Sequence, residues 1–472
     1  MRSLFRFGLV ALLIAIGLAS GLPTPPLAAQ TPTPTPAPGA TTLYVPLILK
    51  RAGQVETGIQ VQNLGTAPAD LAVLYYDTDG FSRPEWTERA SVAPNESFTF
   101  YTPSAPNLPF GFVGSAVIQA TQPVGAIVNV QTQPDVQPFY VGTFVAPRAA
   151  GNTVYLPYAL KQLGSRTSTF TVQNASATAT NVDALFYSRE GLLGRIQVFL
   201  PPFAARRIRL AERGDLPGVM DASAVLQAGQ PIVAIADVFD SATGIYQLYT
   251  GIPAGSPSQL APLVFNDRNG WDSEVRIQNA SPSPVSVRVH VQPTGGGPEI
   301  ISPPIAIPPN APYTFRPSEV GIGSNFVGSA LVEASGNIAA VVAEYNNGRG
   351  TGMAYNAFGP TAATPRISVP LIFKDRNGYD TGIQVQNVDN TDAQVRVTYR
   401  LASGATVVDF GIVPANGSFT FYQPANPQIP PNSVGSAIVE NIAGSQRLVA
   451  IVNEVNYARG GDASSTYEGL NY

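Results

Sequence analysis

The sequence contains no cysteine and only one histidine, His290, among 472 residues. The absence of cysteine excludes disulfides, thiolate metal sites, a catalytic cysteine and a lipid attached through a thiol. With a single histidine, cysteine–histidine catalysis and imidazole-rich zinc sites are excluded as well. His290 lies between Val289 and Val291, where alternation along a strand predicts an exposed side chain. We therefore predict no catalytic residues, no enzyme activity and no resident cofactor.

Charge is also scarce, since Asp, Glu, Lys and Arg make up 12% of the residues and the net charge is −4. No long run of one sign occurs, so nothing indicates a nucleic-acid interface or a polybasic membrane patch. Beyond the first residues no apolar stretch reaches the about 20 residues that a membrane-spanning helix needs. We expect neither a nucleic-acid partner nor a transmembrane segment in the mature chain.

The N-terminus is typical of an export signal over residues 1–29. Arg2 and Arg6 precede an apolar stretch over residues 7–19, and Ala29 follows Ala28 at a plausible cleavage point. An uncleaved membrane anchor is the alternative interpretation. Residues 30–40 are rich in threonine and proline, which predicts an extended linker. The protein is therefore expected outside the cell or on its surface.

The rest of the chain repeats one pattern four times. An apolar strand that carries a proline recurs at Pro46, Pro157, Pro262 and Pro370, which lie 111, 105 and 108 residues apart. The same intervals separate four asparagines that end a strand written Ile-Gln-Val-Gln-Asn or a near variant, namely Asn63, Asn174, Asn279 and Asn387. Three further landmarks recur in the same order: Gly-Ser-Ala or Ala-Ser-Ala, then Ala-Ile-Val-Asn or a variant, then a closing strand with Tyr140, Tyr249, Tyr355 or Tyr467. This register indicates four copies of one unit.

Within each copy the apolar residues recur with a period of two. In Ile59-Gln60-Val61-Gln62 and in Phe98-Thr99-Phe100 apolar and polar residues alternate, so each strand is expected to bury one face. About seven short strands in about 105 residues, separated by Gly, Pro, Asn and Asp, predict a two-sheet antiparallel sandwich. The fold class is thus all-β, with four tandem immunoglobulin-like β-sandwich domains after the signal peptide and linker. Their predicted ranges are 41–150, 151–258, 259–364 and 365–472.

The positions of the prolines lead to two further predictions, one about the first strand of each unit and one about two turns. The first strand of each unit should be an edge strand or carry a bulge, because proline has no N–H to donate. The segments 121–124 and 229–232, Thr-Gln-Pro-Val and Gly-Gln-Pro-Ile, are expected to turn two strands into a hairpin. The spacing does not decide between an extended row of domains, on the order of 150 Å long, and a compact cluster.

Two loops are candidates for ligand binding. Each reads Asp-Arg-Asn-Gly-aromatic-Asp, and together they supply six candidate metal ligands: Asp267, Asn269, Asp272, Asp375, Asn377 and Asp380. Clustered carboxylate and amide oxygens suit Ca²⁺, and an aromatic ring beside them suits a sugar. The alternative is a turn, because Asn-Gly between strands is chiefly a hairpin signal that Asp caps. Calcium is the one ion that this set suggests.

The strands described above, with Phe112-Val113-Gly114-Ser115-Ala116 and its counterpart at 326–330, resemble the tandem immunoglobulin-like repeats of bacterial cell-surface and secreted proteins, as in filamentous green non-sulfur bacteria. The resemblance covers nearly all of residues 41–472 and is weakest in the second unit. It implies a structural or adhesive role in the envelope, with other envelope proteins or copies of the same chain as partners. The alternative is an array of carbohydrate- or calcium-binding modules, with cell-wall polysaccharide as the partner.

Overall fold

The computed structural model describes residues 41–472; the predicted signal peptide and the threonine- and proline-rich linker lie outside the described residues. The described chain is nearly all β-sheet, and its strands pair only in antiparallel fashion, which confirms the all-β prediction. Its helices are single 3₁₀ turns: η1 (Pro84–Trp86), η2 (Thr102–Ser104), η3 (Leu210–Glu212), η4 (Pro317–Val320), η5 (Pro360–Ala362) and η6 (Gln423–Ala425). Over residues 41–472, no helix is long and apolar enough to cross a bilayer.

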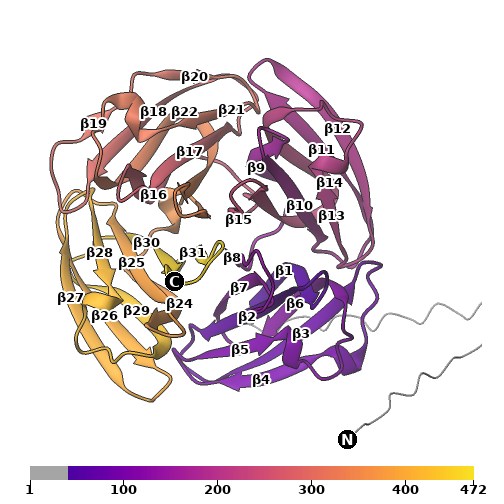
Figure 1. The fold of residues 1–472 in the computed structure, drawn as a ribbon, viewed down its shortest axis with the longest axis horizontal. Helices are drawn as coiled ribbons and strands as arrows, with labels where there is room; N and C mark the ends of the chain where they lie inside the picture. The colour runs from indigo at the N-terminus through magenta and orange to yellow at the C-terminus, as the bar shows by residue number, and fades with distance from the viewer. Residues whose placement is uncertain (1–40) are drawn as a thin grey trace, which may run out of the picture. The chain divides into compact units, whose positions relative to one another are not determined.

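The strands follow one another in four segments, coloured in turn from indigo to yellow in Figure 1. Segment 1 holds β1 (Thr41–Lys50), β2 (Val55–Asn63), β3 (Ala69–Asp77), β4 (Glu88–Val92), β5 (Ser97–Tyr101), β6 (Phe112–Ala120), β7 (Val124–Thr132) and β8 (Val141–Val145). Segment 2 holds β9 (Gly151–Lys161), β10 (Arg166–Asn174), β11 (Thr180–Ser188), β12 (Gly191–Leu200), β13 (Ala205–Arg209), β14 (Met220–Asp240) and β15 (Tyr246–Thr250).

Segment 3 holds β16 (Ser256–Asn266), β17 (Asp272–Asn279), β18 (Val285–Pro293), β19 (Ile300–Ile301), β20 (Ile305–Ile307), β21 (Pro312–Phe315), β22 (Phe326–Asn346) and β23 (Thr351–Asn356). Segment 4 holds β24 (Arg366–Lys374), β25 (Asp380–Asn387), β26 (Ala393–Leu401), β27 (Thr406–Val413), β28 (Ser418–Tyr422), β29 (Ser433–Ala443), β30 (Leu448–Val455), β31 (Ser464–Glu468) and β32 (Leu470–Asn471). The boundary predicted between residues 258 and 259 falls inside β16.

Segments 1 and 4 each contain two sheets. In segment 1 their strand orders are β1-β6-β3-β4 and β5-β2-β7-β8, and in segment 4 they are β27-β26-β29-β24-β32 and β28-β25-β30-β31. In segments 2 and 3 one 21-residue strand, β14 or β22, replaces the pair β6 and β7 and belongs to both halves. The first half of β14 pairs with β9 and β11, and its second half pairs with β10 and β15.

The hairpins predicted at 121–124 and 229–232 are therefore wrong. β6 and β7 do not pair with each other, because β6 lies beside β1 and β3 while β7 lies beside β2 and β8. At 229–232 the chain continues as the one strand β14, and its register on β9 shifts between Gln227 and Ile232. A local turn signal marks a bend in the backbone, but which strand each half pairs with is decided by contacts that are distant in sequence.

The first strand of every segment carries a bulge at its proline. The register of β1 on β6 shifts between Val45 and Ile48, and equivalent shifts occur in β9, β16 and β24. Proline has no N–H for the ladder, so the bulge takes it out of the pairing. The edge position is confirmed for β1, whereas in segment 4 the short strand β32 covers the other side of β24.

A buried tyrosine of the closing strand binds the backbone inside three of these bulges. The hydroxyl of Tyr249 donates to the carbonyl oxygen of Tyr158 at 2.8 Å and accepts from the N–H of the same residue at 3.2 Å. Tyr355 and Tyr467 make the same pair of bonds to the leucine after the proline in their own segments. The side chain thus satisfies backbone groups that the bulge removes from the sheet.

The corresponding residue of segment 1 is Phe144, which pairs with Val128. The sequence alignment assigns this place to Tyr140, which is wrong. Tyr140 precedes β8, and its ring lies 4.8 Å from that of Tyr246 in segment 2. The loop before the closing strand is longer in segment 1 than in segment 2, so alignment by the nearest tyrosine shifts the strand.

Each second strand ends in a fully buried asparagine that fixes the following turn. In segment 3 the side-chain amide of Asn279 donates to the carbonyl oxygens of Ser283 at 2.8 Å and Ile307 at 3.0 Å, and its Oδ1 accepts from Ser281 N at 2.8 Å. The same three kinds of bond are made by the other three asparagines, Asn63, Asn174 and Asn387. The recurrence of asparagine is explained by this turn, which needs both a donor and an acceptor on one short side chain.

The four large hydrophobic cores interlock. Each core consists mainly of residues of one segment and takes in at least one residue of the next. One crossing residue in each core occupies the same position of the Ala-Ile-Val-Asn landmark: Ile235 enters the core of segment 1, Val341 that of segment 2, Ile451 that of segment 3, and Ile127 that of segment 4. Segment 4 thus packs against segment 1 in the same way that segments 1, 2 and 3 pack against the segment that follows each of them in the chain.

The expectation that each second strand buries only one face is wrong. The second glutamine of this strand, at Gln62, Gln173, Gln278 or Gln386, is at most 3% exposed. Between segments, Gln173 Nε2 donates to the carbonyl oxygen of Ala116 at 3.1 Å, and Gln278 Nε2 donates to that of Ala224 at 3.1 Å. A polar face can be buried here because the neighbouring segment supplies hydrogen-bond acceptors.

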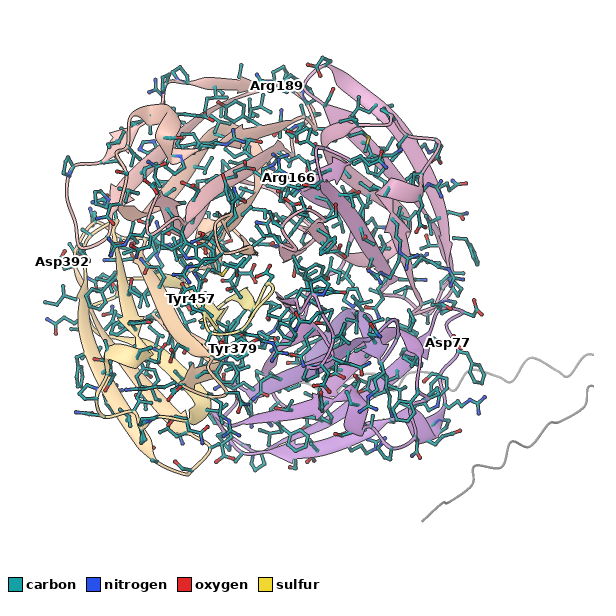
Figure 2. The ribbon with its side chains drawn as sticks, in the orientation of Figure 1. Asp77, Arg166, Arg189, Tyr379, Asp392 and Tyr457 are labelled. Atoms are coloured by element: carbon teal, nitrogen blue, oxygen red, sulfur yellow. The ribbon has the colours of Figure 1, made fainter. Side chains whose placement is uncertain are left out.

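The closing strands β8, β15, β23 and β31 contact one another in a closed circuit: β8 with β15, β15 with β23, β23 with β31, and β31 with β8. The labels of β8, β15 and β31 lie together where the four segments meet in Figure 1. Contacts also join the segments farther out, as at Arg189 (Figure 2), which donates to the carbonyl oxygen of Ala306 at 3.1 Å. These contacts decide the question that the sequence left open, in favour of the compact arrangement for residues 41–472.

Candidate functional site

The six predicted ligand residues lie at two tight hairpin turns. Between β16 and β17, Arg268 and Trp271 exchange backbone hydrogen bonds of 2.9 and 3.0 Å, and Asn269 and Gly270 have φ values of 52° and 82°. Positive φ at both central residues is the signature of a type I′ turn, which Asn-Gly favours. Asp272 Oδ1 accepts a 2.9 Å hydrogen bond from the N–H of Asp267, so that carboxylate caps the turn.

The turn between β24 and β25 repeats this geometry. Asp380 Oδ1 accepts from the N–H of Asp375 at 2.8 Å, and Asn456 Nδ2 donates to the carbonyl oxygen of Asn377 at 3.0 Å. The structure thus brings Asp267, Asn269 and Asp272 together, and likewise Asp375, Asn377 and Asp380, through bonds that shape the turns. Among residues 41–472 no group of three or more His, Cys, Asp or Glu side chains is placed to hold a metal ion. Calcium binding at these turns stays a prediction.

His290 lies between two glutamates. Its Nδ1 is 3.2 Å from Glu299 and its Nε2 is 3.3 Å from Glu333, and the side chain is 16% exposed. The prediction of a freely exposed side chain is therefore wrong, because the short strand β19 pairs with β18 at His290 and covers that edge.

A more concentrated set of polar groups lies where the closing strands meet, and its centre is the fully buried Asp462. The carboxylate accepts hydrogen bonds from Tyr246 N at 2.7 Å, from Thr351 Oγ1 at 2.7 Å and from Gly352 N at 3.1 Å. Backbone bonds also join Asp462 to Phe139 and Val141. One residue of segment 4 is thereby bonded to the other three segments.

Burial raises the pKa of Asp462 to about 7, although these hydrogen bonds act in the opposite direction. Two glutamates nearby are also desolvated: the pKa of Glu344 rises to about 8 and that of Glu454 to about 7. Asn453 Nδ2 donates to Glu344 at 3.0 Å, and Ser465 Oγ donates to Glu454 at 2.7 Å. Burial disfavours the charged form of each carboxyl, so the junction of the closing strands gathers carboxyls that titrate near neutral pH.

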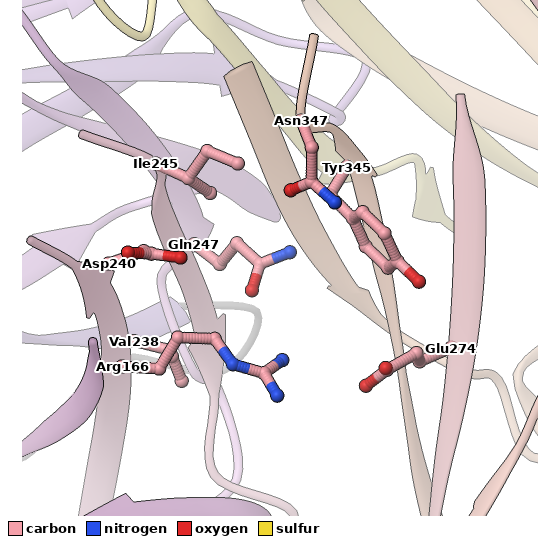
Figure 3. Close-up of a pocket in the computed structure, with 8 residues that line it drawn as sticks. All are labelled: Arg166, Val238, Asp240, Ile245, Gln247, Glu274, Tyr345 and Asn347. Carbon is pink, nitrogen blue, oxygen red and sulfur yellow. The ribbon is translucent and has the colours of Figure 1, made fainter. Parts of the chain in front are cut away.

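A polar pocket of about 230 Å³ lies between segments 2 and 3. Figure 3 shows the Arg166 guanidinium on one wall and the Glu274 carboxylate on the facing wall, with the Tyr345 hydroxyl directed toward Glu274 and Asn347 beside Tyr345. Glu274 is 3% exposed and is paired with Arg316 at 2.6 Å and Arg276 at 3.7 Å. The guanidinium, carboxylate, amide and phenol groups that line it can both donate and accept, which suits a small polar ligand.

Sequence reasoning missed Asp462, Glu344, Glu454 and this pocket. Asp462 follows two glycines in the loop between β30 and β31, and the corresponding loops of the other segments carry no aspartate at this position, so no recurrence marks it. A signal does exist for the glutamates: Val-Ala-Glu at 342–344 and Val-Asn-Glu at 452–454 both place a carboxyl in an otherwise apolar strand. The pocket has no linear signal, because its walls come from two segments.

No protein-family model matches this sequence, and no curated protein matches it. Among solved structures, a similar chain is that of Thermotoga maritima 1070, at 13% identity, covering 24% of this chain and 96% of that one, with a TM-score of 0.20. Another is a tetra-tandem repeat in the extending region of a large adhesion protein, at 12% identity, covering 91% and 99% of the two chains, with a TM-score of 0.12. With TM-scores below 0.5, these likenesses carry no argument, and function must be argued from this chain's own residues.

Replacing Asp462 with Asn is expected to destabilise the protein at pH 7. Either orientation of the amide turns its NH₂ toward a backbone N–H or the Thr351 hydroxyl that now donates to the carboxylate. The buried donor left without an acceptor should lower the free energy of unfolding by about 1–3 kcal/mol, measured by urea denaturation. The exposed Asp70 provides the control, since Asp70→Asn should change it by less than about 0.5 kcal/mol. Equal stability of the two variants would contradict this role of Asp462.

Replacing Glu344 with Gln is expected to raise the melting temperature at pH 9 by several degrees and to leave it unchanged at pH 4. Because the folded-state pKa of about 8 lies above the ordinary value of 4.5, the contribution of this carboxyl is full below pH 4.5 and is lost as pH rises through 8. Glutamine stays neutral and keeps an oxygen for Asn453. Glu85→Gln, at a side chain 55% exposed, is the control; a Glu344→Gln profile parallel to the wild-type profile would contradict the assignment.

Proposed function

We propose that the chain is an exported structural or adhesive protein of a bacterial cell surface, a spacer or assembly element of the envelope. It is composed of four immunoglobulin-like β-sandwich repeats, preceded by a signal peptide and a linker. The proposal rests on the roles of the polar residues that recur in the segments. The recurrent asparagines fix turns, the recurrent glutamines form hydrogen bonds to neighbouring segments, and the recurrent tyrosines bind the backbone of the bulges. Side chains retained in several copies serve cohesion, and no reaction is part of the proposal.

The outward contacts of such a protein need sheet edges or apolar surface, and segment 4 offers both. β27 and β28 each end a sheet, so backbone groups on their outer sides are available for pairing, except at Ser418, whose carbonyl oxygen accepts a hydrogen bond from Gly295 N of segment 3. Phe410 and Ile412 on β27 are 64% and 60% exposed, and Tyr422 on β28 is 48% exposed. Edge strands with exposed apolar side chains favour strand addition by another protein. Copies of the same chain or other envelope proteins are the proposed partners.

The alternative is a carbohydrate- or calcium-binding protein. The polar pocket between segments 2 and 3 supports a sugar as ligand, since its carboxylate and guanidinium walls can accept from and donate to hydroxyl groups. The turns at Asp267 and Asp375 are the candidate sites for calcium.

For the structural role, we expect the purified chain to associate as its concentration rises, because the apolar edge of segment 4 is buried on contact. Sedimentation velocity should show oligomers that the double substitution Phe410→Ser, Ile412→Ser reduces or removes. Phe81→Ser, at a residue 50% exposed in segment 1, is the matched control and should leave association unchanged. A monomer at all concentrations, or equal effects of the two variants, would remove this edge from the proposal.

Isothermal titration calorimetry with Ca²⁺ and with wall polysaccharide distinguishes the structural role from the carbohydrate- or calcium-binding role. The structural role predicts flat traces for both. Heat from Ca²⁺ that Asp375→Asn abolishes would favour the turn sites, and heat from polysaccharide that Glu274→Gln abolishes would favour the pocket. Immunogold labelling of intact cells tests the location, and labelling confined to the cytoplasm would overturn the surface role.

A further inference from the structure

Residues of all four segments line one further cavity, of about 520 Å³. Its wall comes mostly from the stretches that end or follow the closing strands, within 145–149, 250–253, 356–364 and 468–471. Ile252, Phe358 and Leu470 are among the apolar side chains of this wall. A volume of this size lies within the range of about 300–1,000 Å³ that is usual for small-molecule sites, most of which are apolar with few polar groups.

Three polar side chains of this cavity carry oxygen atoms that can accept hydrogen bonds: Glu468, Asn356 and Asn471. Glu468 ends β31 and lines the cavity, and its Oε1 accepts a hydrogen bond from the N–H of Asn356. The side-chain oxygens of Asn356 and Asn471, two other lining residues, are buried and have no hydrogen-bond partner within residues 41–472. A carboxylate and two amide oxygens together make the local potential negative.

Arg148 is the one basic residue among those described in the lining. The residue is exposed overall, but its guanidinium is partly buried: its Nη2 donates to the carbonyl oxygen of Val124 at 2.5 Å, and burial lowers the pKa of Arg148. The backbone of segment 1 holds this guanidinium, and the pKa of Glu468 is set by burial and by backbone hydrogen bonds rather than by the charge of Arg148. An apolar cavity with an acceptor carboxylate is complementary to a cation that carries an apolar body.

We propose that this cavity binds a small organic ammonium ion, with the ammonium group on the Glu468 carboxylate and the apolar body against Ile252, Phe358 and Leu470. A neutral alcohol of the same shape would gain the apolar contact but no ion pair. A carboxylate analogue would place a second negative charge beside Glu468. The site is independent of the surface role proposed above, since all of its groups lie at the junction of the segments.

Calorimetric titration of the full-length chain with 2-phenylethylammonium, 2-phenylethanol and 3-phenylpropionate tests this proposal. At pH 8 the Glu468 carboxyl is mostly ionised, because burial raises its pKa only to about 7. We expect the ammonium ion to bind at least tenfold more tightly than the alcohol, and the propionate more weakly than either. No heat from millimolar ammonium ion, or equal affinity for the ammonium ion and the alcohol, would overturn the proposal.

Two substitutions separate the charge from the apolar wall. Glu468→Gln keeps an oxygen for Asn356 and should weaken ammonium binding at least tenfold without changing alcohol binding. Ile252→Ala should weaken both ligands severalfold and keep the preference between them. Glu212→Gln, at a side chain 67% exposed, is the control, and thermal melting checks that each variant folds. Preference for the ammonium ion that persists in Glu468→Gln would overturn the site; if that variant does not fold, the wild-type preference and the Ile252→Ala result decide.

Discussion

Burial of a second apolar face on one strand of each segment is the constraint on which the arrangement of this protein depends. Ile127, Ile235, Val341 and Ile451 leave their own sandwich and enter the core of a neighbouring segment. Fully burying such a side chain stabilises a protein by about 1.5–3 kcal/mol. A segment alone would expose this face to water, so the segments are stable as a set, and the set is complete only when segment 4 reaches segment 1.

Closing the circuit places polar groups where water is excluded. Asp462 is the clearest case, since donors from segments 2 and 3 converge on its carboxylate while its backbone bonds to segment 1. Hydrogen bonds favour the carboxylate and desolvation opposes it, and the raised pKa shows that desolvation prevails. The junction is therefore held by directional bonds as well as by apolar contact, which fixes the register of one segment on the next.

The recurrent polar residues lie at the junctions between segments and not on the surfaces that are open to partners. The recurrent glutamines and serines form hydrogen bonds between segments: the hydroxyl of Ser115 donates to the carbonyl oxygen of Phe203, and that of Ser223 to the carbonyl oxygen of Asn310. Exposed aromatic and aliphatic side chains remain at the outer edges, as at Phe410 and Ile412. A structural or adhesive role draws on the outer edges, and the cavity beside Glu468 draws on the junction, so neither surface competes with the other.

The strand content, the bulge at each first-strand proline and the two Asn-Gly turns were predictable from the sequence, because each follows from a period of two or from the φ values that Pro, Asn and Gly permit. The path through residues 229–232, the place of Phe144, the burial of the second glutamines and the carboxyl cluster were not. All four depend on which strand or segment lies alongside, and a linear pattern carries no record of its neighbours. The sequence by itself thus determined whether each stretch of chain forms a strand, a bulge or a turn. Only the tertiary structure decided how the four segments close on one another, because that closure is stabilised by contacts between residues from 54 to 325 positions apart.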